Sequence, residues 1–486
     1  MAFHGREREL DQLRSELEKP SPSLIIVYGR RRIGKSTLLK HVVQGRPHIY
    51  FQATIGPGVI NLQSFKDEAA RAIGGSPVLE GLGTWEGVLH YLAEAAAARQ
   101  GLSVIIDEFP YLLEDDKSLP SVLQRFWDAG AARAGNLKLV LCGSAVSQMR
   151  ALLTESNPLY GRTTKRLSLG QLPLRDMAQF FPDYGVEEVI KTYAVFGGVP
   201  HYLSLCDSSL SFRQNVINLL MAESGALLDE PEFLLKTDFD KPRMYSGILS
   251  AIAGGRSSLG EIANRLSVSS TDLSVYLDRL RIVDLVRVER SLHADDRSKN
   301  RRYRLNDRLL TFWHEFVGPN RSAIANGFGE QIFEQILERS FSDFMGAAFE
   351  EICRQYAARH IGEVTGGIPA REVGSLWGFK DFDIDVAGNL LDGTPFFGEV
   401  KWRSVKVDLG MVRTLRERAL ASHYGSDRQG KVFLFFSRSG FRPEVEKAAE
   451  VDASLKLISP QMLLAPAAPS LKKVIDQGSE PSQPGF

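Results

Sequence analysis

The sequence predicts an α/β protein of several domains, and three observations lead to that fold class. At 486 residues, the chain is longer than a single hydrophobic core usually organises. An apolar stretch from Ser23 runs into a glycine-rich loop and then a helical pattern, which is the order found in a parallel α/β sheet. Far downstream, residues 396–402 (FFGEVKW) form another apolar strand, which carries Glu399 and Lys401 two positions apart.

Composition indicates a globular protein, with 43% hydrophobic and 24% charged residues. Lys plus Arg equals Asp plus Glu at 59 each, so the net charge does not indicate a nucleic-acid partner. The N-terminus lacks the pattern of a signal peptide, and no apolar run approaches the ~18 residues of a membrane span. We therefore expect a cytoplasmic protein with no membrane partner. The three cysteines lie far apart with no C-x-x-C spacing, so the sequence suggests neither a disulfide scaffold nor a cysteine-based zinc site.

The first chemical motif is a phosphate-binding loop in residues 23–43 (SLIIVYGRRRIGKSTLLKHVV). Backbone amides of such a loop close on phosphate oxygens, Lys35 neutralises the β and γ oxygens, and Ser36 can ligate magnesium. The predicted cofactors are ATP and Mg²⁺, and the alternative is a decayed loop. Nucleotide contacts are expected along the whole loop, at Gly29, Arg30, Arg31, Arg32, Ile33, Gly34, Lys35, Ser36 and Thr37.

Four further polar residues follow apolar strands or turns. Asp107 and Glu108 end the strand SVIIDEF, where the first acid holds magnesium and the second positions or deprotonates water; a solvated strand end is the alternative. Ser144 follows LKLVLC and is predicted to sense the γ-phosphate, unless it only caps the strand. Arg162 is a candidate charge-stabilising arginine, acting in cis or across a subunit boundary of a homo-oligomer, although exposed arginines are common.

These motifs resemble the archaeal-type ATPases of the STAND class of P-loop NTPases, which are AAA-like. The matching pieces are FHGREREL, GRRRIGKST, VIIDEF, LCGSAVSQM, PLYGRTTKRLSL and VFGGVPHYL. The resemblance implies a helical lid in which Gly197, Gly198 and Pro200 lie, with Pro200 close to the nucleotide, and it places residues 3–6 near the base. An ordinary helix-terminating turn is the alternative for GGVP. The small polar residue that often follows the sensor serine is missing after Ser144.

The middle of the chain predicts a winged helix-turn-helix. Apolar residues recur at helical spacing from Leu249 to Leu266, and SVSS supplies a turn and an N-cap for a third helix over 271–283. From 281 to 308 there are nine Arg or Lys against five acids, which favours contacts with DNA phosphates. Two acids on the third helix favour a purely internal packing role instead. Both interpretations stay open.

Near the C-terminus, the register of one hairpin decides whether a second site exists. A two-residue turn at Asp392-Gly393 would put Asp385 and Glu399 on opposite faces of the sheet. A three-residue loop over 391–393, with Gly393 in the left-handed region, pairs Asp385 with Glu399. The site requires the three-residue loop.

In that register, Asp385, Glu399 and Lys401 meet on one face. The pattern resembles PD-(D/E)xK nucleases, as does the C-terminal domain of the same ATPase family. The resemblance implies that Asp385 and Glu399 hold magnesium, that Lys401 orients water or stabilises charge, and that Glu350 is an outer acid. A structural salt bridge between Glu399 and Lys401 is the alternative, and no proline precedes Asp385.

Together these motifs predict an ATP-binding and ATP-hydrolysing switch coupled to DNA binding and a nuclease-like domain, in defence or DNA maintenance. One alternative is an ATP-gated DNA-binding or scaffold protein with an inactive nuclease fold, and another binds ATP but hardly hydrolyses it. The expected domains are an ATPase core over 1–170, a helical lid over 171–240, a winged helix over 241–310, a helical connector over 311–340, an α/β restriction-endonuclease-like domain over 341–465, and a disordered tail over 466–486.

Overall fold

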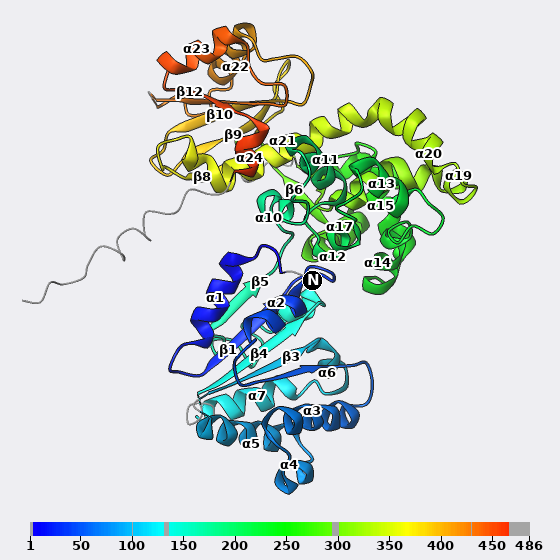
Figure 1. The fold of residues 1–486 in the computed structure, drawn as a ribbon, viewed down its shortest axis with the longest axis vertical. Coiled ribbons are helices and arrows are strands. Elements are labelled where there is room, and N and C mark those ends of the chain that lie inside the picture. The colour runs from blue at the N-terminus through cyan, green and yellow to red at the C-terminus, as the bar shows by residue number, and fades with distance from the viewer. Residues whose placement is uncertain (1–2, 100, 131–135, 294–300, 429, 466–486) are drawn as a thin grey trace, which may run out of the picture.

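The computed structural model describes residues 3–99, 101–130, 136–293, 301–428 and 430–465. Figure 1 shows an N-terminal sheet with its helices, a helical region in the middle, and a second sheet near the C-terminus. The expected α/β class with two separate sheets is confirmed. The expected tail over 466–486 lies outside the described residues.

The N-terminal sheet has five parallel strands in the order β2-β3-β4-β1-β5. The strands are β1 (Ser23–Tyr28), β2 (His48–Gln52), β3 (Leu102–Asp107), β4 (Leu137–Gly143) and β5 (Lys165–Ser168). Successive side chains of a strand point to opposite faces. Accordingly, Ile25 and Val27 belong to one hydrophobic core, and Leu24 and Ile26 belong to another.

Helices cover both faces of this sheet, so the domain has three layers (Figure 1). Helices α1 (Glu7–Leu17) and α2 (Lys35–Val42) pack on the face of Ile25. The other face is covered by α3 (Gly58–Ile73), α4 (Pro77–Gly81), α5 (Trp85–Ala98), α6 (Pro110–Asp115), α7 (Leu119–Asp128) and α9 (Val146–Ala151).

A helical region follows β5. Its first helices, in the expected lid, are α10 (Leu174–Ala178), α11 (Val186–Phe196), α12 (Pro200–Leu205), α13 (Phe212–Leu220) and α14 (Glu230–Asp238). The next elements are α15 (Pro242–Ala253), α16 (Leu259–Leu266), α17 (Ser270–Ile282), β6 (Val286–Glu289) and β7 (Arg302–Leu305). Strands β6 and β7 pair antiparallel, so the expected order of three helices and a two-stranded wing is present. We call β6, β7 and the described residues 290–293 and 301 between them the wing.

Short helices link the wing to a long one. They are α18 (Arg308–Phe312), the π-helix η1 (Trp313–Val317), η2 (Gly318–Asn320), α19 (Arg321–Ala325), α20 (Gly329–Ile332) and the π-helix η3 (Phe333–Leu337). The long helix α21 (Glu338–His360) and the turn η4 (Ile361–Glu363) then lead into the C-terminal sheet. Phe344, Ala348 and Ile352 of α21 are buried in the core that also holds the first face of the N-terminal sheet.

The C-terminal sheet is mixed, with the order β12-β11-β10-β9-β8. Its elements are β8 (Ala370–Leu376), β9 (Ile384–Leu390), β10 (Pro395–Lys401), α22 (Leu409–Ala421), β11 (Val432–Ser437), α23 (Pro443–Val451), β12 (Leu455–Ile458) and α24 (Pro460–Leu464). Strands β8, β9 and β10 pair antiparallel, whereas β10, β11 and β12 pair parallel.

The decisive hairpin between β9 and β10 has the three-residue loop. Pro395 faces Asn389 and Gly398 faces Val386. The Gly393 amide donates to the Leu390 carbonyl at 3.0 Å, and Gly393 has φ 87°. Of the two registers that the sequence left open, the structure has the one that the second site requires, and its continuation places Asp385 opposite Glu399.

The C-terminal domain packs back onto the lid. In Figure 1, α24 lies beside α10, and Arg175 of α10 donates to the Leu463 carbonyl at 3.1 Å. Arg438 forms a second link, an ion pair of 2.8 Å with Glu187 of α11. Among the described residues, no helix is both long enough and apolar enough to cross a membrane.

Candidate functional site

The phosphate-binding loop opens into a cavity of about 540 Å³ between the N-terminal sheet and the lid. Of the predicted nucleotide-binding residues, those that line the cavity are Arg31, Arg32, Ile33, Gly34, Lys35, Ser36, Thr37 and Pro200. Gly29, Arg30 and Ser144 are not among the residues that line it. The cavity walls also include Phe3, His4 and Arg6, as the resemblance implies for the base.

The loop holds Lys35 at its centre. Gly34, with φ 87°, is the N-cap of α2 and lets the chain turn into the helix. The Lys35 ammonium donates to the Gly29 carbonyl at 2.9 Å and to the Arg30 carbonyl at 3.0 Å. Burial lowers the pKa of Lys35. A nucleotide phosphate would compete with these carbonyls for the ammonium, as the predicted role of Lys35 requires.

Asp107 gathers the groups expected around a magnesium ion. The Ser36 hydroxyl donates to Asp107 Oδ2 at 2.5 Å, and so does the Tyr50 hydroxyl at 2.5 Å. Burial would raise the pKa of Asp107, but the hydrogen bonds from Ser36 and Tyr50 lower it below its usual value. A hydroxyl and an ionised carboxylate side by side are ligands that Mg²⁺ accepts. The residues present therefore fit Mg-ATP, in which the ion would neutralise phosphate charge.

Tyr50 was missed by the sequence analysis. It sits on β2, which pairs with β3, in a half-buried strand of alternating side chains. The sequence did offer a signal for it: Tyr50 is a polar aromatic residue near the end of β2, the strand that pairs with the Asp107 strand. The ends of parallel strands meet at one edge of a sheet, which brings such side chains together.

Replacement of Tyr50 by phenylalanine should weaken magnesium use without removing nucleotide binding. One hydrogen bond to a charged group contributes about 1.5–3 kcal/mol, so we expect ATP turnover to fall about 10-fold and the required Mg²⁺ concentration to rise. A magnesium titration of ATPase activity measures both. Tyr91→Phe, on α5, is the matched control. Equal magnesium curves for the two variants would contradict the role given to Tyr50.

Glu108 is fixed directly beside Asp107. Its backbone has φ 51°, a left-handed conformation that is unusual for a residue with a side chain. The Ser144 hydroxyl and amide donate to its carboxylate at 2.9 and 3.0 Å. Ser144 therefore orients Glu108 in this structure, and its predicted sensing of the γ-phosphate stays a prediction.

The GGVP element lies against the phosphate-binding loop. A side chain added at Gly34 would contact the Pro200 ring at 3.5 Å, and the His201 amide donates to the Arg32 carbonyl at 3.4 Å. Close approach explains Gly198, since an added side chain there would collide with the Leu172 backbone. The position that the resemblance implies for Pro200 agrees with this geometry.

Arg162 is bonded to Asp128 and is not part of the wall of this cavity. Its guanidinium forms two hydrogen bonds with Asp128, at 2.8 and 2.7 Å, and also donates to nearby carbonyls. Arg162 does not line the nucleotide cavity. A role across a subunit boundary therefore stays a prediction.

The three successive arginines of the loop each contact one acid of the helical region. Arg30 pairs with Asp307 at the start of α18, Arg31 lies 3.7 Å from Asp238 in α14, and Arg32 pairs with Glu230 in the same helix. These acids were not predicted, because no local spacing relates them to the loop. We call these three contacts the arginine clasp.

A second group of charged residues surrounds Asp385. Its carboxylate accepts a hydrogen bond from the Val400 amide at 2.9 Å. Burial and the neighbouring charges of Glu350 and Glu399 raise the pKa of Asp385 to about 7. Glu350 and Glu399 therefore both lie close enough to Asp385 to act on its charge.

Glu399 and Lys401 form the ion pair that the structural alternative predicts. The Lys401 ammonium lies 2.5 Å from Glu399, and Arg418 of α22 lies 3.5 Å from the other carboxylate oxygen. Within residues 3–465 as far as the structure describes them, no three His, Cys, Asp or Glu side chains are grouped to hold a metal ion. A magnesium site here would require Glu399 to leave one of its cationic partners.

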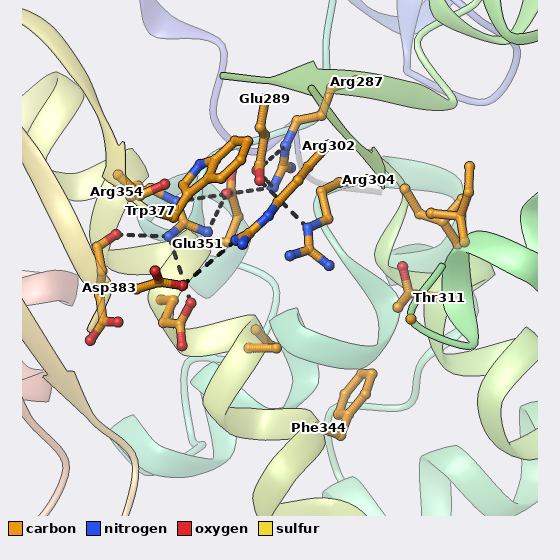
Figure 2. A pocket seen from close by; sticks show the side chains of 18 of the residues that line it. Arg287, Glu289, Arg302, Arg304, Thr311, Phe344, Glu351, Arg354, Trp377 and Asp383 are labelled. Atoms are coloured by element: carbon orange, nitrogen blue, oxygen red, sulfur yellow. Dashed lines mark hydrogen bonds and ion pairs between the residues drawn. The ribbon is translucent and has the colours of Figure 1, made fainter. Parts of the chain in front are cut away.

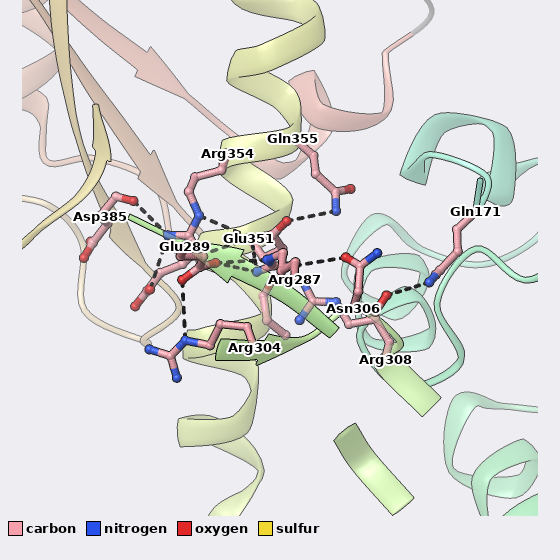
Figure 3. Close-up of polar contacts among 12 residues, drawn as sticks. Gln171, Arg287, Glu289, Arg304, Asn306, Arg308, Glu351, Arg354, Gln355 and Asp385 are labelled. Atoms are coloured by element: carbon pink, nitrogen blue, oxygen red, sulfur yellow. Dashed lines mark hydrogen bonds and ion pairs between the residues drawn. The ribbon is translucent and has the colours of Figure 1, made fainter. Parts of the chain in front are cut away.

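Polar contacts connect the lid to these carboxylates (Figure 3). In order, the members are Gln171, Asn306, Arg287, Glu351, Arg354 and Asp385. Arg287 of the wing donates to Glu351 at 2.6 Å, and Arg354 donates to the Asp385 carbonyl at 2.9 Å. In the described wing, Arg287 faces the C-terminal domain, which favours the internal role over free contact with DNA.

The parallel sheet, the glycine-rich loop with Lys35 and Ser36, and the Asp107–Glu108 strand end define a P-loop ATPase. Residues 3–206 match the family described as an ATPase domain predominantly from Archaea, and residues 313–412 match a family described as archaeal and bacterial proteins of unknown function. A protein of Methanocaldococcus jannaschii named "Uncharacterized protein MJECL04" is 32% identical over 410 residues, which cover 83% of this chain and 88% of that protein. The chain belongs to this family of archaeal-type ATPases, for which nucleotide binding is implied.

Two solved structures are similar. The Walker-type ATPase PABY2304 of Pyrococcus abyssi has a TM-score of 0.50 and 20% identity, covering 64% of this chain and 96% of that one. At this identity the likeness shows the fold alone. The ORC2 protein of Aeropyrum pernix has a TM-score of 0.41 and 18% identity, covering 68% of this chain and 95% of that one.

Proposed function

We propose that the protein is an ATP-hydrolysing switch of the STAND class, in which the nucleotide controls a nuclease-like C-terminal domain that acts on DNA. Lys35 and the loop amides would bind the phosphates, Ser36 and Asp107 would hold magnesium, and Glu108 would position water. Defence or DNA maintenance in the cytoplasm is the setting that we propose for it.

The arginine clasp is the observation that carries the switch. Arg31 and Arg32 line the nucleotide cavity while they contact Asp238 and Glu230. A γ-phosphate would compete with these carboxylates for the same guanidinium groups, because arginine binds both anions with the same geometry. Nucleotide binding would then loosen the lid, and hydrolysis would restore the contacts.

The hairpin register supports the nuclease-like part of the proposal. It places Asp385 opposite Glu399, with Lys401 two residues further along β10. We propose that Asp385 and Glu399 would hold a magnesium ion and that Lys401 would orient water or stabilise charge at a phosphodiester. Burial in a mixed sheet would raise the energy of these charges unless a partner or a metal balances them.

A second candidate is an ATP-gated DNA-binding or scaffold protein with an inactive nuclease fold. The contacts of Glu399 with both Lys401 and Arg418 favour it, since they already balance the carboxylate without a metal. The two candidates agree on the nucleotide site and differ in whether phosphodiester bonds are broken.

Cleavage of DNA by the Glu399→Ala variant distinguishes them. The full chain is incubated with plasmid and with single-stranded DNA, with and without ATP and Mg²⁺. For a nuclease, we expect magnesium-dependent cleavage that falls about 100-fold or more in the variant, because a metal-binding carboxylate is lost. Glu417→Ala, an exposed acid of α22, is the matched control. Cleavage that is unchanged in Glu399→Ala sinks the nuclease proposal, and DNA binding without any cleavage supports the scaffold.

A further inference from the structure

A cavity of about 480 Å³ lies between the wing and the C-terminal domain (Figure 2). Strands β6 and β7 line one side, and α21 and the start of β9 line the other. Glu350 and Asp385, two of the carboxyls predicted for the nuclease-like site, are part of its wall. The cavity therefore opens onto that site from the wing side.

Three of the arginines that line this cavity serve the packing of the domains. Arg287 and Arg354 share the carboxylate of Glu351, at 2.6 and 3.2 Å. Arg308 donates to the Ala348 carbonyl of α21 at 3.4 Å. Arg287 and Arg308 hold the wing and α18 against α21, and Arg354 links α21 to the Asp385 carbonyl at the start of β9. A ligand could take these guanidinium groups only by breaking those contacts.

Arg302 and Arg304 are held more loosely. Arg302 lies 3.8 Å from Asp383, and Arg304 lies 3.5 Å from Glu289, with side-chain exposures of 31% and 41% for the two arginines. Ion pairs of this length and exposure contribute only about 0–1 kcal/mol. In Figure 2 the guanidinium of Arg304 points into the open space of the cavity. An anion in the cavity could therefore bind both arginines at little cost.

The wing covers this cavity and is bonded to the C-terminal domain. The Leu292 amide donates to the Ser375 carbonyl at 3.2 Å, and the Trp377 amide donates to the Ser291 hydroxyl at 2.9 Å. Arg302 also lies over the Trp377 ring, 4.0 Å from its centroid. These contacts join the wing to the end of β8, the edge strand of the C-terminal sheet.

The size of this covered cavity limits which ligands can enter it. A volume of about 480 Å³ lies in the usual range of small-molecule sites, about 300–1,000 Å³. Duplex DNA, whose major groove alone is about 12 Å wide, is too large for it. One flexible strand can reach between the wing and α21.

The charges of the wall suit a phosphodiester with a divalent cation. Besides the arginines, seven carboxyl groups line the cavity, at Glu289, Glu315, Asp343, Glu350, Glu351, Asp383 and Asp385. Phosphates would bind the arginine side, and a cation would balance the carboxylate side. A ligand with one sign of charge only would leave one of the two sets unbalanced.

We propose that this cavity is the entry site for a single strand of nucleic acid, and that Arg302 and Arg304 bind its phosphates next to Asp385. The inference rests on the proposed nuclease-like function and names the strand that the site admits. The wing then belongs to the nuclease-like site rather than to a separate duplex-binding surface.

Binding of labelled single-stranded DNA to full-length Arg304→Ala protein tests the inference. The measurement uses fluorescence anisotropy with Ca²⁺ in place of Mg²⁺, at several salt concentrations. We expect at least fivefold weaker binding. The slope of log K against log salt, which is negative, should become shallower by about 0.7, the value of one lost phosphate contact with a single strand. Arg301→Ala is the matched control, because it removes one charge from an exposed neighbour that does not line the cavity.

The outcomes separate this inference from the function on which it rests. Equal weakening in Arg304→Ala and Arg301→Ala, or tighter binding of duplex than of single strands by the unmodified protein, overturns the entry site even where magnesium-dependent cleavage is found. Absence of both DNA binding and cleavage in the unmodified protein overturns the proposed function itself. Arg304→Lys keeps the charge and should restore most of the affinity, which a folding defect caused by lost packing would not allow.

Discussion

Lys35→Ala is expected to abolish ATP turnover, with a loss of at least about 10²–10³-fold. The ammonium group lies at the centre of the loop, bonded to the Gly29 and Arg30 carbonyls, where the β and γ oxygens of ATP would be bound. Alanine leaves the growing negative charge of the leaving phosphate without its nearest cation. Phosphate release from ATP and the affinity for a fluorescent ATP analogue are the two measurements.

Two further variants make this result specific. Glu108→Gln should keep nucleotide binding and lose turnover, because the variant retains the loop but loses the group predicted to position water. Lys117→Ala, at an exposed residue of the same domain, should behave like the unmodified protein. Turnover by Lys35→Ala at the normal rate would contradict the assignment of the loop.

Asp307→Ala is expected to have the largest effect on stability. Asp307 is 1% exposed and pairs with Arg30, which is 6% exposed. Removal of one partner of a buried ion pair typically costs about 3–5 kcal/mol, because the other charge is left unbalanced. The variant also loses the cap of α18, where the Asp307 carboxylate accepts from the Leu310 amide at 2.9 Å. We expect the midpoint of thermal unfolding to fall by at least about 6 °C.

A second capping aspartate separates the two contributions. Asp408→Ala removes the cap of α22, where Asp408 accepts from the Met411 amide at 3.0 Å, and involves no buried ion pair in the described structure. It should cost only about 1 kcal/mol. Arg30→Met combined with Asp307→Leu should recover most of the loss, since replacing both charges leaves neither unbalanced. If Asp307→Ala lowered the midpoint of thermal unfolding no more than Asp408→Ala does, the stabilisation assigned to the buried ion pair would be contradicted.

Local patterns explain what the sequence could predict. The loop from Gly29 to Ser36 is contiguous, and its chemistry depends on backbone turns that neighbouring residues determine. The hairpin could be narrowed to two registers from the sequence, because Gly393 can adopt the left-handed conformation that a three-residue loop needs, but the choice between them needed the structure. The third helix of the winged-helix segment was expected over 271–283 and lies at Ser270–Ile282.

Contacts between distant segments explain what it could not predict. Arg30 and Asp307 are separated by 277 positions, and no spacing rule relates them. The basic residues of the wing left contact with DNA and internal packing both open, and in the structure Arg287 turns inward to Glu351. Which way the side chains of a wing face depends on the domain that packs beside it. A count of charges along the chain does not contain that information.

The contact between α24, near the C-terminus, and α10 of the lid also limits how the domains of such a protein can be exchanged, in evolution or by engineering. Arg175 and Glu187 of the lid hold residues from the far end of the chain, Leu463 and Arg438. A C-terminal domain transplanted from another protein would fit this lid only if it carried residues that bind Arg175 and Glu187. Recombination between such proteins should therefore preserve the lid and the C-terminal domain together, and chimaeras that exchange both should express better than those that exchange one.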